Sequence, residues 1–183
     1  SLFGGVGTAL LLAAQLANRM NATLRIVTRT EVPSAWNAAQ ILRAYGIQLR
    51  HEIQLKFSPA ARDGSDWEAG TATAGLDIHP DETFITTSWW TTAATLPSVP
   101  QTSIIYLLQE DERMFYPFGD DRVQCERILN NQDIRFVVNT RLLYDHLVAD
   151  GLGHLKRNGN WFEPGFPKAL FHERHREPGG KKP

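Results

Sequence analysis

Three stretches of this sequence combine residue types that could bind or transform a polar ligand. The first is Phe3-Gly4-Gly5-Val6-Gly7-Thr8, a glycine-rich segment that opens an apolar-periodic helix. Residues without side chains let the backbone approach a ligand, and free N–H groups at a helix start favour an anion such as a diphosphate. Leu10 replaces the third glycine of the dinucleotide fingerprint, and the lysine of a P-loop is absent. A tight turn needed for helix–strand packing is the alternative interpretation.

The second stretch is a pair of tryptophans, Trp89 and Trp90, followed by Thr91 at the end of a predicted strand. An indole beside a pocket offers a flat apolar platform for a sugar ring and an N–H donor. Since adjacent strand residues point to opposite faces, we expect at most one of the two to face a cleft. Burial of both in the core is the alternative, because burial is common for this residue type.

The third stretch, Gln109-Glu110-Asp111-Glu112-Arg113, places three carboxylates directly after the most apolar predicted strand. Clustered carboxylates raise one another's pKa, so the group could supply a general base or accept hydrogen bonds from sugar hydroxyls. Glu112 is our first candidate for the base and Glu110 the second. The alternative is a solvated loop with Glu112 and Arg113 exposed and with the following aromatic segment, Phe115 to Phe118, as lid packing.

The histidines and the lone cysteine offer no comparable site. His172 and His175 lie near the C-terminus and His79 in a predicted loop, so no metal-ligand spacing arises and we expect no bound metal. Cys125 falls on a predicted helix, where burial is more typical than nucleophilic reactivity.

The elements that must position these stretches alternate between helix and strand. Apolar periodicity predicts a parallel sheet with helices on both faces, a Rossmann-like α/β fold. Ligands bind such sheets at the carboxyl ends of the strands, so we expect all three stretches at one concave edge. Residues 58–74 are predicted as a long loop, and strands 24–28, 83–87, 103–108 and 134–138 as neighbours in the sheet. Helices are predicted over residues 6–20, 34–45, 121–129 and 140–150, a short helix before Pro97, and further strands over 52–57 and 160–163.

Composition restricts the class of protein. The chain has 183 residues, 42% hydrophobic and 21% charged, with a net charge of -1, which favours one domain and gives no electrostatic footprint for nucleic acid. A single cysteine and the absence of a long apolar run favour a cytoplasmic protein, with peripheral association at the inner face of the membrane as an option. We expect residues 1–170 to form a domain that lacks its first strand, and residues 171–183 to form a linker.

Taken in order, these motifs resemble the WsaF-type bacterial rhamnosyltransferases, which are GT-B glycosyltransferases that use dTDP-L-rhamnose. The resemblance rests on four segments and a final Phe162-Glu163-Pro164, and it spans most of the chain. Arg113-Met114 stand where the family has Pro-Gly, so we expect a different loop geometry and, with it, room for a different acceptor. The segments are Phe3-Gly4-Gly5-Val6-Gly7-Thr8-Ala9-Leu10, Thr87-Ser88-Trp89-Trp90-Thr91, Ile105-Tyr106-Leu107-Leu108-Gln109-Glu110-Asp111-Glu112 with Phe115-Tyr116, and Val138-Asn139-Thr140-Arg141-Leu142-Leu143.

The resemblance implies an acceptor-binding N-terminal half of a GT-B fold, acting in surface polysaccharide or glycoprotein glycan synthesis and inactive alone. The nucleotide-sugar, dTDP-L-rhamnose, would bind mainly to a C-terminal domain, without a metal. It also implies that the glycine segment, the Trp89 region, Gln109 and Tyr116 bind substrate. An inverting reaction needs a carboxylate base, whereas a retaining one needs none. The competing hypothesis is a non-catalytic Rossmann-like ligand-binding module; a nicotinamide-dependent enzyme is disfavoured by the broken glycine fingerprint.

Overall fold

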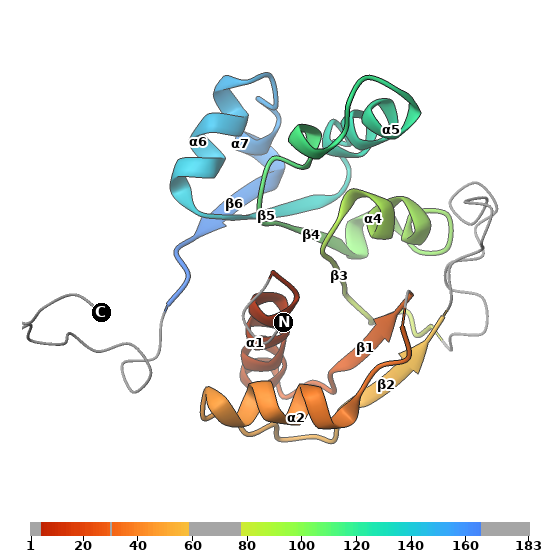
Figure 1. The fold of residues 1–183 in the computed structure, drawn as a ribbon, viewed down its shortest axis with the longest axis vertical. Helices are drawn as coiled ribbons and strands as arrows, with labels where there is room; N and C mark the ends of the chain where they lie inside the picture. Colours follow the sequence, from red (N-terminus) through yellow and green to blue (C-terminus); the bar gives the residue numbers. More distant parts are fainter. Residues whose placement is uncertain (1–4, 30, 59–77, 166–183) are drawn as a thin grey trace, which may run out of the picture.

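Two parallel sheets carry the fold (Figure 1). The structure is a computed structural model that describes residues 5–29, 31–58 and 78–165. Gly4, nearly all of the predicted 58–74 loop and the predicted linker lie outside these ranges. The elements are α1 (Gly5–Met20), β1 (Arg25–Thr28), α2 (Ala35–Ala44), β2 (Gln54–Phe57), β3 (Phe84–Thr86), α4 (Trp89–Thr95), η2 (Gln101–Ser103), β4 (Ile104–Leu108), η3 (Glu112–Phe115), α5 (Asp120–Leu129), β5 (Arg135–Asn139), α6 (Arg141–Ala149), α7 (Leu155–Asn158) and β6 (Gly159–Phe162).

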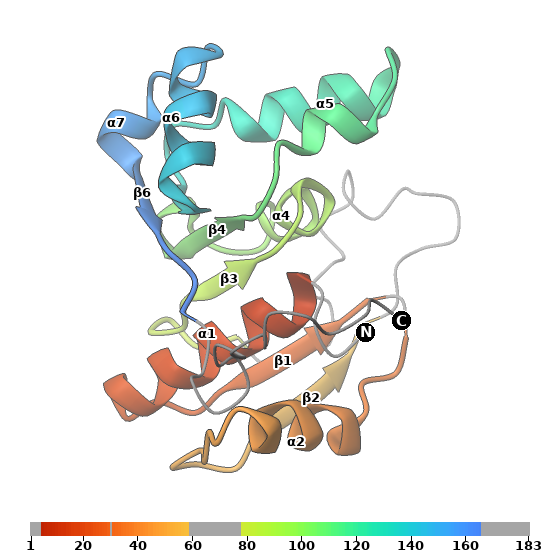
Figure 2. The ribbon, with the colours of Figure 1, turned by 60° about the vertical axis from the view of Figure 1, so that its left-hand side comes forward.

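The larger sheet has the order β3-β4-β5-β6, and every pair in it is parallel. Its central strand β4 is apolar on both faces, with Ile104, Tyr106 and Leu108 fully buried. Both views place α4, α5 and α6 on one side of this sheet and α1 on the other (Figures 1 and 2). The predicted α/β class, with parallel strands and helices on both faces, is therefore confirmed.

The smaller sheet consists of β1 and β2, which pair in parallel beside α2. The prediction that residues 24–28 neighbour the other three strands in one sheet is wrong for the described residues, whereas β3, β4 and β5 are adjacent as expected. Both β1 and β3 are short, and Val27 and Ile85 are more than a third exposed. A salt bridge between Arg25 and Glu82 links the two sides.

The helix boundaries follow from capping chemistry that the sequence already contains. Ser34 and Thr140 accept hydrogen bonds from the N–H groups of the first turns of α2 and α6. Gly46 and Gly151, with φ of 66° and 98°, follow the ends of the same helices in the left-handed region that favours glycine. These termini lie within one or two residues of the predicted ones.

The core gathers around β4 and β5 and includes the only cysteine. Cys125 of α5 is fully buried beside Leu129, Tyr106 and Phe136 in one apolar cluster. Burial and then the negative charge of Glu112 raise the pKa of the Cys125 thiol to about 12. The thiol is therefore a packing group in the folded protein. None of the helices in the described ranges is long and apolar enough to cross a membrane.

Candidate functional site

A polar cavity of about 280 Å³ lies where β3, β4 and β5 end, and we call it the strand-end cavity. Thr87 directly follows β3, the segment after β4 supplies three side chains, and Asn139 is the last residue of β5. The first turn of α1 forms the remaining wall. Parallel strands bring their carboxyl ends to one edge of the sheet, which explains why segments far apart in sequence meet here. The lining residues are Gly5, Thr8, Thr87, Gln109, Glu110, Glu112 and Asn139.

The lining is rich in hydrogen-bonding groups and carries only negative charge. Two amides and two hydroxyls face the cavity together with the carboxyl groups of Glu110 and Glu112, and none of the seven lining residues is Lys or Arg. Amides and hydroxyls both donate and accept, so they match the alternating donors and acceptors of a polyhydroxylated ligand. The two carboxylates disfavour an anionic ligand such as a diphosphate.

Glu112 is a buried carboxyl group whose two oxygens both accept hydrogen bonds. The hydroxyl of Tyr106 donates to Oε1 at 2.7 Å, and the backbone N–H of Trp89 donates to Oε2 at 2.9 Å. Burial raises the pKa of Glu112, the two hydrogen bonds lower it, and the nearby charge of Glu110 raises it, with a net increase. Glu112 thus ties the segment after β4 to the first residue of α4.

Glu110 has a different environment although it lies only two residues away. Its side chain is exposed at the cavity and makes no hydrogen bond with any described residue. Arg113, by contrast, is largely buried, as is Glu112. The alternative of a solvated loop with Glu112 and Arg113 exposed is therefore wrong, because the loop is anchored by buried polar contacts.

Gly5 packs closely against the side chain of Gln109. A Cβ atom built on Gly5 would lie 3.0 Å from Nε2 and 3.1 Å from Oε1 of Gln109. The amide of Gln109 therefore occupies the space next to the first residue of α1. Among the described residues of the glycine segment, Gly5 makes this close contact with Gln109. Gly5 and Thr8 both line the cavity.

A sequence model of the WsaF N-terminal domain matches residues 1–141, a range that includes every residue lining the cavity. The chain belongs to the WsaF N-terminal domain family. At the level of the family, membership indicates a glycosyltransferase-related domain. Comparison with curated proteins and comparison with solved structures gave no match.

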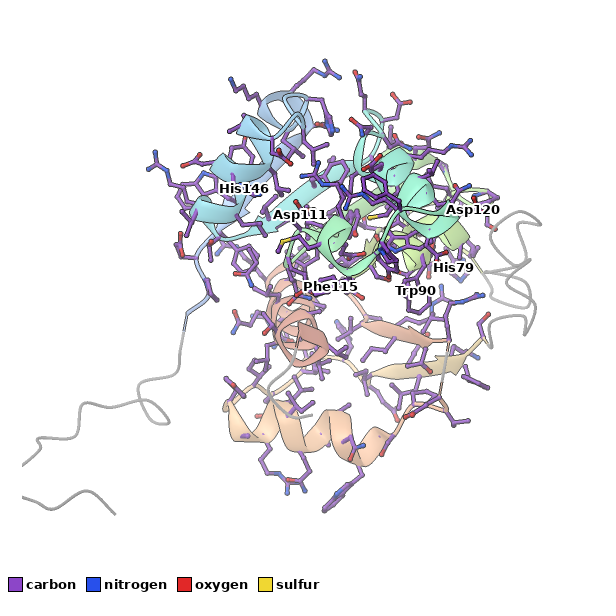
Figure 3. All side chains as sticks on the ribbon, turned by 45° about the horizontal axis from the view of Figure 1, so that its top comes forward. His79, Trp90, Asp111, Phe115, Asp120 and His146 are labelled. Atoms are coloured by element: carbon purple, nitrogen blue, oxygen red, sulfur yellow. The ribbon has the colours of Figure 1, made fainter. Side chains whose placement is uncertain are left out.

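Trp89 and Trp90 do not line the strand-end cavity of this WsaF-family domain. Trp89 is 2% exposed and packs edge-on against Tyr116, with ring centroids 5.6 Å apart. Trp90 is partly buried against the same core and lies apart from Asp111 and His146 in Figure 3. Both belong to α4 and not to the end of β3.

A capping box explains why the chain turns helical at Trp89. Ser88 accepts from the N–H of Thr91 while the hydroxyl of Thr91 accepts from the N–H of Ser88. The side chain of Thr91 is therefore engaged in capping the start of α4.

In α1, Gly7 is buried, whereas Val6 is 79% exposed and does not line the cavity.

A second polar cluster, formed by Asp111, His146 and Asp150, has ligand atoms within 4.8 Å of one another (Figure 3). Its centre is occupied by Arg113, whose guanidinium contacts Asp111 Oδ2 and Asp150 Oδ2, each at 2.7 Å. Burial would raise the pKa of Asp111, but the hydrogen bonds and charge of Arg113 outweigh burial and the pKa is lowered. The cluster is accounted for as an ion-pair network, since a cationic side chain already satisfies the carboxylates.

Thr87 and Asn139 line the cavity, although neither is among the ligand-binding residues predicted from the sequence. Thr87 ends the predicted strand 83–87, and Asn139 directly follows the predicted strand 134–138. The signal that could have found them is the same strand-end rule that identified Gln109 and Glu110, because each directly follows or ends a predicted strand.

Proposed function

We propose that this domain binds the acceptor glycan of a two-domain GT-B glycosyltransferase. In this proposal the enzyme is rhamnosyltransferase-like, transfers rhamnose from dTDP-L-rhamnose, and acts in the cytoplasm in surface polysaccharide or glycoprotein glycan synthesis. The donor binds mainly to a separate C-terminal domain. The observation that carries the proposal is the strand-end cavity, a polar site in a domain of a glycosyltransferase-related family.

The size and charge of the cavity support a sugar as its ligand. A volume of about 280 Å³ is at the lower end of the range for small-molecule sites, as suits a single sugar residue. The amides of Gln109 and Asn139 and the hydroxyls of Thr8 and Thr87 can each bond a sugar hydroxyl. A nucleoside diphosphate fits poorly beside two carboxylates, which supports the assignment of the donor to another domain.

In the proposed reaction an acceptor hydroxyl attacks the anomeric carbon of the donor. The new C–O bond forms as the bond to the diphosphate breaks, and the nucleoside diphosphate leaves with the bonding electrons. In an inverting enzyme the hydroxyl proton passes to a carboxylate. We assign this role to Glu110 in preference to Glu112, because both oxygens of Glu112 already accept hydrogen bonds. A retaining enzyme needs no such base.

A saccharide titration tests the binding part of the proposal. Methyl α-L-rhamnopyranoside and rhamnose oligosaccharides are added to the isotopically labelled chain, and backbone amide shifts are followed by NMR. We expect saturable shifts for Thr8, Gln109 and Asn139, with dTDP alone causing much smaller ones. Shifts that are absent at tens of millimolar saccharide, or confined to residues away from the cavity, would refute the proposal.

The catalytic part is tested in the enzyme that carries both domains. Glu110→Gln preserves shape but removes basicity, so turnover should fall about 100-fold or more with saccharide affinity unchanged. Glu112→Gln serves as the matched comparison and should mainly reduce stability. The reverse pattern would assign the base to Glu112, and normal turnover in both variants would favour a retaining reaction without a protein base.

A further inference from the structure

Asn139 has a buried polar atom without a partner in the wall of the strand-end cavity. Its Oδ1 is inaccessible to solvent and accepts no hydrogen bond from any described residue. Its backbone is engaged in the sheet, where Asn139 pairs with Phe162 of β6. An orphaned buried acceptor of this kind is uncommon in folded proteins and calls for an explanation.

Other asparagines of the described chain do not share this property. Asn158 donates from Nδ2 to the carbonyl of Ile134 at 2.9 Å, and its Oδ1 contacts Nδ1 of His154 at 2.9 Å. Asn18 donates to the carbonyl of Gln48 and accepts from the N–H of Arg50. The fold therefore satisfies structural asparagine amides, and Asn139 is left unsatisfied at the cavity.

We propose that Asn139 is a specificity-determining residue, whose amide oxygen accepts a hydrogen bond from a hydroxyl of the neutral sugar in the strand-end cavity. This inference rests on the proposed function. The side chain already lines the cavity, and a rotation about its Cβ–Cγ bond, a soft torsion in asparagine, turns the oxygen towards a ligand. The ligand hydroxyl then supplies the partner that the folded chain lacks.

The energetic consequence is discrimination between ligands that have and lack the matching hydroxyl. In the free protein the desolvation cost of Oδ1 is already present, and a ligand hydroxyl supplies the donor that relieves it. A deoxy analogue leaves the acceptor unsatisfied and is rejected. Gln109, whose amide makes no hydrogen bond with any described residue, lines the same cavity and provides a second contact for the ring.

The test combines binding and stability for Asn139→Leu, which preserves size but removes both polar atoms. Affinity for methyl α-L-rhamnopyranoside, measured by NMR titration, should fall about 10-fold or more. The melting temperature should stay the same or rise, because an unsatisfied acceptor has been removed. If Asn139 is only a structural residue, Asn139→Leu should instead lower the melting temperature and leave the saccharide affinity unchanged. That result would overturn the inference, and so would a variant that fails to fold.

Asn158→Leu is the matched control, because its amide is satisfied at the opposite end of β5. The partner carbonyl of Ile134 lies five residues before Asn139, roughly 16 Å along an extended strand. This variant should lose stability and keep its saccharide affinity. In the unmodified chain, one monodeoxy analogue should bind about 10-fold more weakly, and this difference should vanish in Asn139→Ala.

The outcomes separate this inference from the proposed function. If the unmodified chain binds no saccharide, the proposed function fails, and the role of Asn139 fails with it. If the unmodified chain binds the glycoside and both Asn139 variants bind equally well, only the role of Asn139 is refuted. Equal binding of all monodeoxy analogues to the unmodified chain would likewise refute only the role of Asn139.

Discussion

Removing the hydroxyl of Tyr106 should expose the contribution of the buried Glu112 carboxylate to stability. Tyr106 is fully buried in β4, and its hydroxyl donates to Glu112 Oε1 at 2.7 Å. Tyr106→Phe keeps the ring and leaves that oxygen without its donor. A hydrogen bond to a charged group contributes about 1.5–3 kcal/mol, so we expect a loss of about 2 kcal/mol at neutral pH, or about 4–8 °C in melting temperature.

The pH dependence gives this prediction a definite sign. Burial raises the pKa of Glu112 above its ordinary value of 4.5, so the folded protein retains this proton to higher pH than the unfolded chain. The contribution of Glu112 to stability is complete below about pH 4.5 and decreases as the pH rises through the folded-state pKa. The hydrogen bond from Tyr106 opposes that shift. Without it the pKa is higher still, so the deficit of Tyr106→Phe should be larger at pH 7.5 than at pH 5.

Urea denaturation at the two pH values measures the effect, with Tyr144→Phe as the control. The hydroxyl of Tyr144 donates to the neutral carbonyl of Leu155 at 3.1 Å. Its removal should cost about 1 kcal/mol, with no change between the two pH values. A Tyr106→Phe variant as stable as the unmodified chain at pH 7.5, or a deficit that is the same at both pH values, would refute the coupling between Tyr106 and an ionised Glu112.

Three further substitutions test the surroundings of the cavity. Gly5→Ala should push the Gln109 amide aside and weaken saccharide binding in an NMR titration, while the melting temperature stays equal or rises because alanine favours helix; unchanged binding would contradict this. Trp89→Ala should cost about 3–5 kcal/mol in urea denaturation, as for a core aromatic; a small loss would reopen its role in binding. Arg113→Leu should cost about 3 kcal/mol at neutral pH, and the loss should shrink in acid as Asp111, whose pKa is lowered, becomes protonated; a pH-independent loss would argue against the ion pair.

The strands and helices could be predicted because their signals are local. The apolar run of β4, the serine and threonine caps and the glycines after α2 and α6 each act within a few residues. The strand-end rule then placed Gln109 and Glu110 at the site. The separation into two sheets could not be predicted, because it depends on contacts between strands far apart in sequence.

The inward orientation of the buried Glu112 carboxylate could not be predicted from the sequence either. Glu112 bonds a hydroxyl six residues away and a backbone N–H 23 residues away, so its inward rotation depends on the assembled fold. The position of Trp89 followed from a competition between strand and helix that the Ser88–Thr91 capping box decided. The capping-box residues can be read from the sequence, but the sequence does not show that they start a helix at Trp89 instead of extending the predicted strand.

The burial of the only cysteine makes the native chain a convenient substrate for site-specific labelling. Because Cys125 is inaccessible and its pKa is about 12, thiol-reactive dyes should leave it unmodified while the fold is intact. A fluorophore or spin label can therefore be attached to a cysteine introduced at an exposed position, such as Leu142 on α6, without first replacing Cys125. The same thiol becomes a reporter under denaturing conditions, since its rate of alkylation measures how often α5 separates from the core.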